Sequence, residues 1–203
     1  MMSIAKLLKD QITRQNPGAV FCANDFSDLG SRGNVDVTLH RLAHSGVIRR
    51  LGYGLYDKPS TSPLLGDLSP ALSDIVKAYA RRTGQTITLD PLGAANALSL
   101  TTQVPAKTTF LTNGKSHTLQ ICGIDIQLIH ASPKKLVGAG KPVGLIIQAL
   151  RYFGNSIVPD DTLQALSRRL TDKDVKALSS LKNKTLLSLI PHIDRILKYA
   201  SVH

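Results

Sequence analysis

Hydrophobic residues near the start of the chain recur with the period of an amphipathic helix. The apolar face consists of Ile4, Leu7, Leu8 and Ile12. This spacing predicts a first helix, which the turn-forming residues at 16–18 end. A short apolar stretch at 20–22 follows. Next comes a second helix of little more than one turn, which Asn24 can cap and Gly30 can end.

A third helix is predicted over 31–45, because apolar residues again repeat at helical spacing. Its buried face consists of Val35, Leu39 and Leu42. After Gly46, two β-rich runs at 47–51 and 53–56 flank Gly52 and predict a small hairpin. Helix, short helix, tight turn, helix and hairpin is the order of a winged helix-turn-helix domain. In such a domain the third helix enters the DNA major groove, and the wing contacts the backbone or the minor groove.

The hydrophobic pattern stops at 59–67, where prolines, serines and a threonine gather. We interpret this stretch as a linker between a winged-helix domain (1–58) and a mixed α/β domain with a helical C-terminal part (68–203). In the second domain, Asn113-Gly114 favours a hairpin within a small antiparallel sheet. The expected strands are 108–111, 118–121 and 124–129. The expected helices are 71–82, 90–100, 143–153, 160–170, 172–181 and 191–200. The predicted fold class is therefore α+β.

Composition adds a strong positive charge. The 203 residues include 25 Lys and Arg against 14 acidic residues, all of them Asp, for a formal net charge of +11. Such a basic chain indicates a polyanionic partner, and nucleic acid is the first candidate. No apolar run approaches the length of about 20 residues that a membrane helix needs, and the N-terminus has no signal-peptide apolar block. We therefore expect a cytoplasmic protein with no membrane partner.

Polar residues outside the buried face of the third helix are candidates for reading DNA. They are Ser31, Arg32, Asn34, Thr38 and Arg41, whose side chains can bond phosphates or base edges. In the hairpin, the candidates for phosphate or minor-groove contact are Arg49, Arg50 and Tyr53. Asp36 and Asp57 lie near the same surface and would repel phosphate, so the contacts would be local. The competing interpretation is that these residues only solvate an exposed helix and strand.

Motifs for catalysis or metal binding are weak. His40 and His44 share a helical face, but no HExxH motif and no carboxylate partner accompany them. Cys22 and Cys122 have apolar neighbours, which favours inert core thiols. The glycine-rich segment 138–141 lacks the spacing of a Walker or GxGxxG motif, so we interpret it as a turn before a helix. We therefore expect no enzyme activity, no cofactor and no metal.

Basic residues are also spread over the second domain. Eight of them lie within about fifty residues: Lys134, Lys135, Arg168, Arg169, Lys173, Lys176, Lys182 and Lys184. They form solvated helix faces, an extension of the DNA footprint or a site for another polyanion, and the sequence leaves these three interpretations open.

Three N-terminal segments carry a resemblance to a known family. Phe26-Ser-Asp-Leu-Gly30, Val37-Thr-Leu-His-Arg-Leu42 and Gly46-Val-Ile-Arg-Arg-Leu-Gly-Tyr-Gly-Leu-Tyr56 resemble the winged-helix module of AbiEi-type antitoxins, the transcriptional regulators of type IV toxin-antitoxin systems. Residues 93–98, 101–105 and 110–114 are similar to the start of that family's second domain. The resemblance covers residues 1–135.

The resemblance implies a repressor of its own operon, bound to double-stranded DNA at inverted repeats upstream. It also implies a second domain that counteracts a nucleotidyltransferase-like toxin without a stable complex. By the same resemblance, Val37, Leu39 and Leu42 support the fold. The possible DNA contacts that carry over are Arg41, Arg49, Arg50 and Tyr53. Because helix-turn-helix proteins usually meet a palindromic site in pairs, we expect a dimer on DNA.

Two other functions remain open from the sequence. The winged helix could instead bind a protein partner, which would make the chain an adaptor. RNA binding draws on the same positive charge, but only 4% of the residues are aromatic, which disfavours recognition by base stacking.

Overall fold

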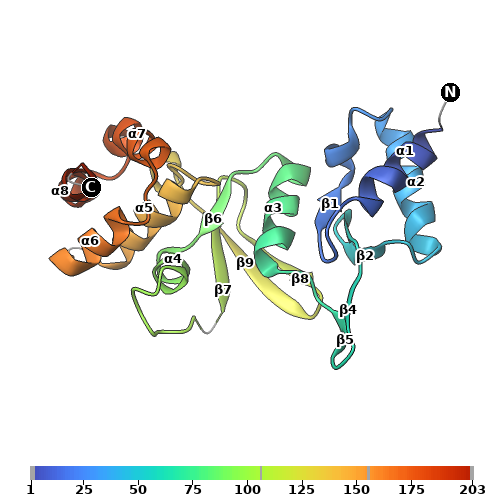
Figure 1. The fold of residues 1–203 in the computed structure, drawn as a ribbon, viewed down its shortest axis with the longest axis horizontal. Coiled ribbons are helices and arrows are strands. Elements are labelled where there is room, and N and C mark those ends of the chain that lie inside the picture. Colours follow the sequence, from blue (N-terminus) through green and yellow to red (C-terminus); the bar gives the residue numbers. More distant parts are fainter. Residues whose placement is uncertain (1–2, 106, 155, 202–203) are drawn as a thin grey trace. The chain divides into compact units, whose positions relative to one another are not determined.

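The computed structural model describes residues 3–105, 107–154 and 156–201, and its fold is α+β (Figure 1). The chain divides into two compact units. The first unit contains the residues up to 85 together with 121–124, and the second contains 86–120 and the residues from 125 onward. Across the described ranges, no helix has both the length and the apolar character needed to cross a membrane.

The helices of the first unit confirm the sequence pattern closely. They are α1 (Ile4–Thr13), the 3-10 turn η1 (Ala23–Phe26), α2 (Arg32–His44) and α3 (Leu72–Thr83). Ser3 caps α1 and Ser31 caps α2, each accepting a backbone N–H in the first turn. The expected second helix is shorter than predicted and ends at Phe26, whose buried ring joins the core of this unit.

Three antiparallel strands complete the winged-helix part of the first unit. The strands are β1 (Val20–Cys22), β2 (Arg49–Gly52) and β3 (Leu55–Asp57), in the order β1-β3-β2. The predicted hairpin is therefore confirmed, and the apolar stretch at 20–22 pairs with its second strand. All three tip residues, 52–54, have positive φ, which explains glycine at two of these positions.

Residues 59–67 form a hairpin, so the expectation of a linker there is wrong. Strands β4 (Ser60–Ser62) and β5 (Gly66–Leu68) pair antiparallel around a turn at 63–65. Both prolines lie outside the paired strands, where their missing N–H breaks no ladder bond. The cluster of turn residues therefore marked a hairpin and its flanks.

The sequence suggested that the helix at 71–82 belongs to the second domain. This is wrong, because the structure places that helix, α3, in the first unit. Its buried face packs on β1, β3 and η1. Arg81 Nε and Nη2 donate to the two carboxylate oxygens of Asp25 at 2.6 and 3.0 Å, and Nη2 also donates to the Val20 carbonyl at 3.1 Å. These contacts join segments about sixty residues apart in sequence, which no local pattern reveals.

The sheet of the second unit is mixed, which corrects the prediction of an antiparallel sheet. Its strands are β6 (Ile87–Leu89), β7 (Thr108–Thr112), β8 (His117–Ile121) and β9 (Ile124–His130), in the order β6-β7-β9-β8. Strand β7 runs parallel to β9, so Asn113-Gly114 forms no hairpin between β7 and β8. Instead, the Asn113 side chain accepts the Thr86 N–H at 2.9 Å and fixes the start of β6.

The described residues of the second unit also form five α-helices and the 3-10 turns η2 (Pro133–Lys135), η3 (Lys182–Lys184) and η4 (Leu187–Leu189). The α-helices are α4 (Pro91–Ala97), α5 (Pro142–Tyr152), α6 (Asp160–Ser167), α7 (Asp172–Leu181) and α8 (Ile190–Ala200). As predicted, Asp90 caps α4 and Pro91 occupies its first turn. Helix α5 is buried along most of its length. A Cβ on Gly144 would lie 2.0 Å from the Gly138 carbonyl oxygen, so the glycine-rich segment is a close-packed turn against α5.

Candidate nucleic-acid interface

Helix α2 lies on the first unit with one face buried and the other exposed. Val35 and Leu39 are fully buried in a core that includes Leu8, Ile12 and Phe26. The opposite face is exposed over three turns: Gly33, Asn34, Val37, His40, Arg41 and His44. The resemblance implied that Val37 supports the fold. This is wrong, because Val37 is 51% exposed.

The candidates at the start of α2 are already engaged. Ser31 uses its hydroxyl as the cap of the helix. The Arg32 Nε lies 2.9 Å from Asp36, and its Nη1 donates to the Asn24 amide oxygen. The Asn24 amide nitrogen donates in turn to the carbonyls of Arg81 and Arg82, at 2.9 and 3.1 Å. Arg32 thus links α2 to the end of α3, and Asp36 offsets its charge.

Asn34 and Arg41 are the candidates that remain available further along α2. Both side chains are exposed, and within the described part of the chain neither makes a hydrogen bond or ion pair. Thr38 is half-buried and donates its hydroxyl to the Asn34 carbonyl at 2.7 Å, which occupies its donor. An amide and a guanidinium at i and i+7 lie on one helical face, two turns apart.

Arg49 is a structural residue, which corrects its assignment as a DNA contact. Its guanidinium bonds both carboxylate oxygens of Asp57, at 3.1 and 2.6 Å, and donates to the Leu68 carbonyl at 2.8 Å. The sequence analysis placed Asp57 near a surface where it would repel phosphate. Asp57 is instead fully buried. The hydrogen bonds that the Arg49 guanidinium donates to the Asp57 carboxylate raise the pKa of Arg49 above its usual value. This ion pair holds β2, β3 and β5 together.

The neighbouring hairpin residues are placed differently. Arg50 is exposed, and among the residues described here it has no hydrogen-bonded or ion-paired partner. Tyr53 lies at the hairpin tip, is 43% exposed and meets the Tyr79 ring of α3 edge-on, with centroids 6.5 Å apart. The hairpin tip is thus braced by α3. Burial raises the pKa of the Tyr79 hydroxyl.

The structure adds one residue that sequence reasoning missed. Arg82, at the end of α3, lies against the hairpin tip, since a Cβ on Gly54 would be 2.7 Å from its Nε. The Arg81-Arg82 pair is visible in the sequence, but it falls beyond the stretch interpreted as a linker. Only the packing of α3 brings this cation beside the wing.

The histidines and cysteines lie in separate places. The rings of His40 and His44 stack 6.1 Å apart on the exposed face of α2. Cys22 is buried as expected, and burial raises its pKa. Cys122 is exposed, contrary to the expectation of a core thiol, because it occupies the β8–β9 turn with positive φ. Within the described ranges, no three His, Cys or Asp side chains gather as metal ligands.

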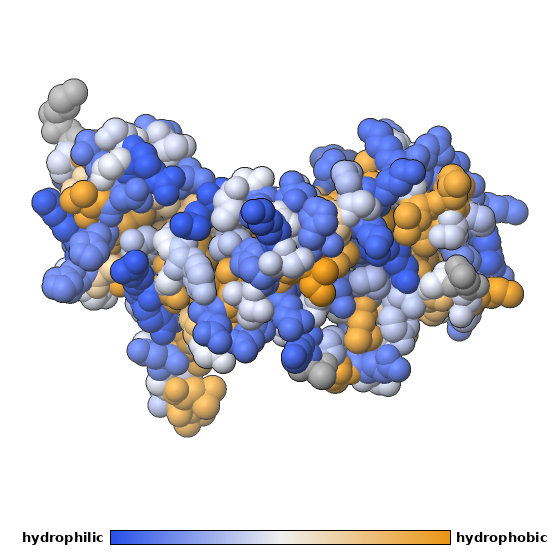
Figure 2. Space-filling view, turned by 180° about the vertical axis from the view of Figure 1, so that it is seen from behind, coloured by the Kyte–Doolittle hydropathy of each residue, from blue (hydrophilic) through white to orange (hydrophobic). Residues whose placement is uncertain are grey.

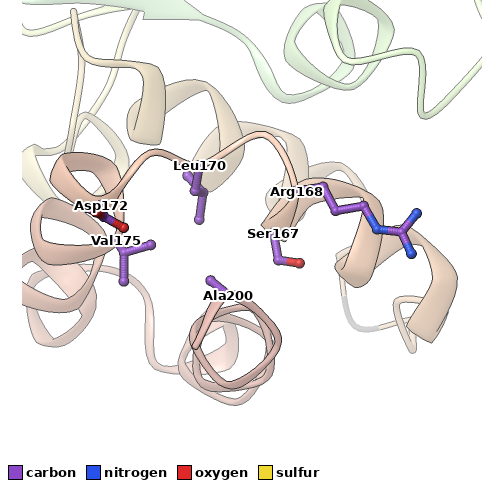
Figure 3. A pocket seen from close by; sticks show the side chains of 6 residues that line it. All are labelled: Ser167, Arg168, Leu170, Asp172, Val175 and Ala200. Atoms are coloured by element: carbon purple, nitrogen blue, oxygen red, sulfur yellow. The ribbon is translucent and has the colours of Figure 1, made fainter. Parts of the chain in front are cut away.

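The basic residues of the second unit lie on several elements. Lys182 pairs with Asp194 at 2.7 Å. The other seven are exposed: Lys134, Lys135, Arg168, Arg169, Lys173, Lys176 and Lys184. A pocket of about 460 Å³ also opens in this unit, lined by Ser167, Arg168, Leu170, Asp172, Val175 and Ala200 (Figure 3). The Arg168 guanidinium points away from it, and the Ser167 hydroxyl donates to the Gln164 carbonyl at 2.8 Å.

Comparison with known proteins places the chain in a family. The model described as "Family of unknown function (DUF6088)" matches residues 7–192. The chain belongs to this family. No curated protein matches this DUF6088 member. Among solved structures, it is similar to the crystal structure of the RV2827C protein from Mycobacterium tuberculosis, with 17% identity and a TM-score of 0.39, covering 98% of this chain and 78% of that one.

Proposed function

We propose that this protein is a DNA-binding transcriptional regulator whose first unit reads DNA through α2. The observation that carries the proposal is the exposed face of α2. There Asn34 and Arg41 have polar side chains without a partner among the described residues, on a helix fixed by a buried core. An exposed helix of this kind fits the major groove. The net charge of +11 supports association with a polyanion.

Each available side chain has a distinct role in this proposal. Asn34 can bond an adenine edge in two places, and Arg41 can do the same with guanine. Arg50 and Arg82 supply cations for phosphate contacts beside the hairpin tip. Arg49 acts indirectly, because it fixes the strand that carries Arg50.

The resemblance to AbiEi-type antitoxins gives the proposal its biological form. We infer a cytoplasmic autorepressor that binds inverted repeats upstream of its own operon as a pair of chains. The second unit would counteract a nucleotidyltransferase-like toxin without forming a stable complex. In this proposal the protein has no enzymatic activity and needs no cofactor.

Fluorescence anisotropy of the full chain tests the proposal. The DNA upstream of its own gene is compared with a scrambled duplex from about 50 to 200 mM salt, over which electrostatic binding falls steeply. We expect preference for the native sequence at the upper salt. Equal, salt-labile binding of both duplexes would contradict the proposal.

A pair of arginine variants locates the interface in the same assay. Arg41→Ala should weaken specific binding by about 1 to 3 kcal/mol, the cost of losing a base contact. Arg14→Ala removes the same charge from the exposed end of α1 and serves as the control. Equal effects of the two variants would remove Arg41 from the reading surface.

A further inference from the structure

Arg151 is a half-buried cation in the last turn of α5, within the second unit (Figure 1). In the described part of the chain it has no carboxylate at ion-pair distance. Asp90 favours its charge only from farther away, and one oxygen of that carboxylate accepts the Gly93 N–H at 2.8 Å. Burial lowers the pKa of Arg151. A guanidinium that has lost water and gained no counter-ion attracts an anion.

Neutral groups hold this guanidinium in place. The Arg151 Nη1 donates to the Gln148 Oε1 at 2.5 Å and lies 3.4 Å from the Lys135 carbonyl oxygen. Gln148 is fully buried, and its Nε2 donates to the same carbonyl at 2.5 Å. Among the residues that the structure describes, nothing accepts a hydrogen bond from the Arg151 Nε or Nη2. One nitrogen of the guanidinium is therefore fixed, and the other two still have donors to offer.

The edge formed by Nε and Nη2 binds carboxylates elsewhere in this chain. Through it, Arg49 holds both oxygens of Asp57, and Arg81 holds both oxygens of Asp25. Arg151 has the same two donors without such a partner among the described side chains. Because a planar guanidinium matches the two oxygens of a carboxylate, this is the group that fits the available edge.

A recess of about 220 Å³ opens beside this side chain. Its lining consists of Arg151, Gly154, Leu186, Ser188 and Leu189. One cation, one hydroxyl and two leucines match a ligand with a single negative charge and an apolar body. The volume is below the roughly 300–1,000 Å³ of sites for drug-sized molecules, so the ligand has only a few carbon atoms.

We propose that this recess binds a short-chain carboxylate. The two carboxylate oxygens meet the Arg151 Nε and Nη2, and the Ser188 hydroxyl donates to one of them. The hydrocarbon part packs on Leu186 and Leu189. The ligand thus supplies the counter-ion that the half-buried cation lacks, and the site does not depend on the proposed function in DNA binding.

An NMR titration of the full chain with sodium butyrate tests the proposal. Butyramide is the neutral analogue of the same size, and sodium chloride keeps the ionic strength constant. Butyrate should shift the amide signals of the residues that line the recess. Butyramide should bind at least about tenfold more weakly, because it forms no charge-assisted hydrogen bond. Equal affinities of the two compounds, or shifts only at other basic residues, would overturn the inference.

Inorganic phosphate separates a carboxylate site from a general anion site. At neutral pH phosphate is mostly a dianion without an apolar part, and the recess offers one cation beside two leucines. We expect phosphate to bind more weakly than butyrate. Tighter binding of phosphate would overturn the assignment to a carboxylate.

Two variants with the same loss of charge locate the site. Arg151→Gln should lower the affinity for butyrate by more than about tenfold. Arg169→Gln removes an exposed arginine of the second unit and should leave the affinity unchanged. Thermal unfolding shows whether each variant folds. If Arg151→Gln does not fold, the exposed Ser188→Ala takes its place and should weaken butyrate binding about threefold. Unchanged affinity in the variant that folds would overturn the inference.

Discussion

Two adjacent arginines of the hairpin show how differently neighbouring residues can be used. Arg49 and Arg50 look equivalent in the sequence, and both suited a phosphate. Strand alternation directs Arg49 toward the buried Asp57 and leaves Arg50 in solvent. The sequence could not reveal this, because Asp57 is a cross-strand partner whose register depends on the turn at 52–54.

We predict that Arg49→Ala and Arg50→Ala have opposite signatures. Arg49→Ala leaves Asp57 buried without its partner and should lower the free energy of unfolding by about 3 kcal/mol. Arg50→Ala should leave stability unchanged within about 0.5 kcal/mol and weaken DNA binding. Urea denaturation and anisotropy separate the two effects. A destabilised Arg50→Ala would contradict the placement of that side chain in solvent.

Val37 gives a second prediction at this scale, and it depends on the proposed function. An exposed valine on a DNA-reading helix can contact the methyl group of thymine. Replacing the contacted thymine by deoxyuridine should then cost about 1 kcal/mol, the value of a buried methyl. Val37→Ala should bind both duplexes alike. A full deoxyuridine scan without effect on the unaltered chain would exclude this contact.

His192 makes the second unit sensitive to acid. Its Nδ1 is buried without a hydrogen-bond partner among the described residues, and burial followed by Arg195 lowers its pKa below the usual 6.5. The unfolded chain takes up the proton first as the pH falls, so stability is lost below about pH 6.5. We expect His192→Gln to flatten this part of the pH–stability curve. A curve identical to that of the unaltered chain would contradict this role.

At the scale of elements, the sequence predicts what local chemistry decides. The caps Ser31 and Asp90 place the starts of α2 and α4 correctly, because a cap acts within one turn. The parallel pairing of β7 with β9 escaped prediction, since it skips the intervening strand β8 and no local turn signal specifies it. Asn113-Gly114 was misleading for the same reason: its turn leads to a strand that pairs elsewhere.

Two helical glycines should respond oppositely to the same substitution. A Cβ on Gly144 would overlap the Gly138 carbonyl, whereas a Cβ on Gly33 meets no atom within 4 Å. Gly144→Ala should destabilise by at least about 2 kcal/mol. Gly33→Ala should stabilise by about 0.5 to 1 kcal/mol, the difference in helix propensity. Thermal unfolding of both variants checks this pair, and a tolerated Gly144→Ala would exclude the close approach.

At the scale of the whole molecule, the boundary of the first unit lies later than the sequence indicates. The predicted winged helix ended at 58, but α3 covers its strands and Arg81 pairs with Asp25. The candidate site, too, could be predicted from the sequence only where it does not depend on α3. Asn34, Arg41 and Arg50 could be selected from the sequence, whereas the position of Arg82 depends on α3.

Two fragments test this boundary. A fragment of residues 1–85 should show the cooperative thermal transition of a folded domain by circular dichroism. A fragment of residues 1–58 exposes the apolar surface that α3 covers, and it should unfold at lower temperature or lack a transition. Equal melting of the two fragments would show that α3 contributes nothing to the unit.

The β4–β5 hairpin also separates two kinds of position. Its base is held to the rest of the unit, because Arg49 and Lys58 donate to backbone carbonyls there. Its tip, an apolar cap in the space-filling view (Figure 2), is free of such contacts among the described side chains of Leu64 and Leu65, which are 95% and 76% exposed. Exposed loop tips tolerate inserted residues, whereas hydrogen-bonded backbone does not. The tip is therefore a place where this protein can carry an inserted label without disturbing its fold.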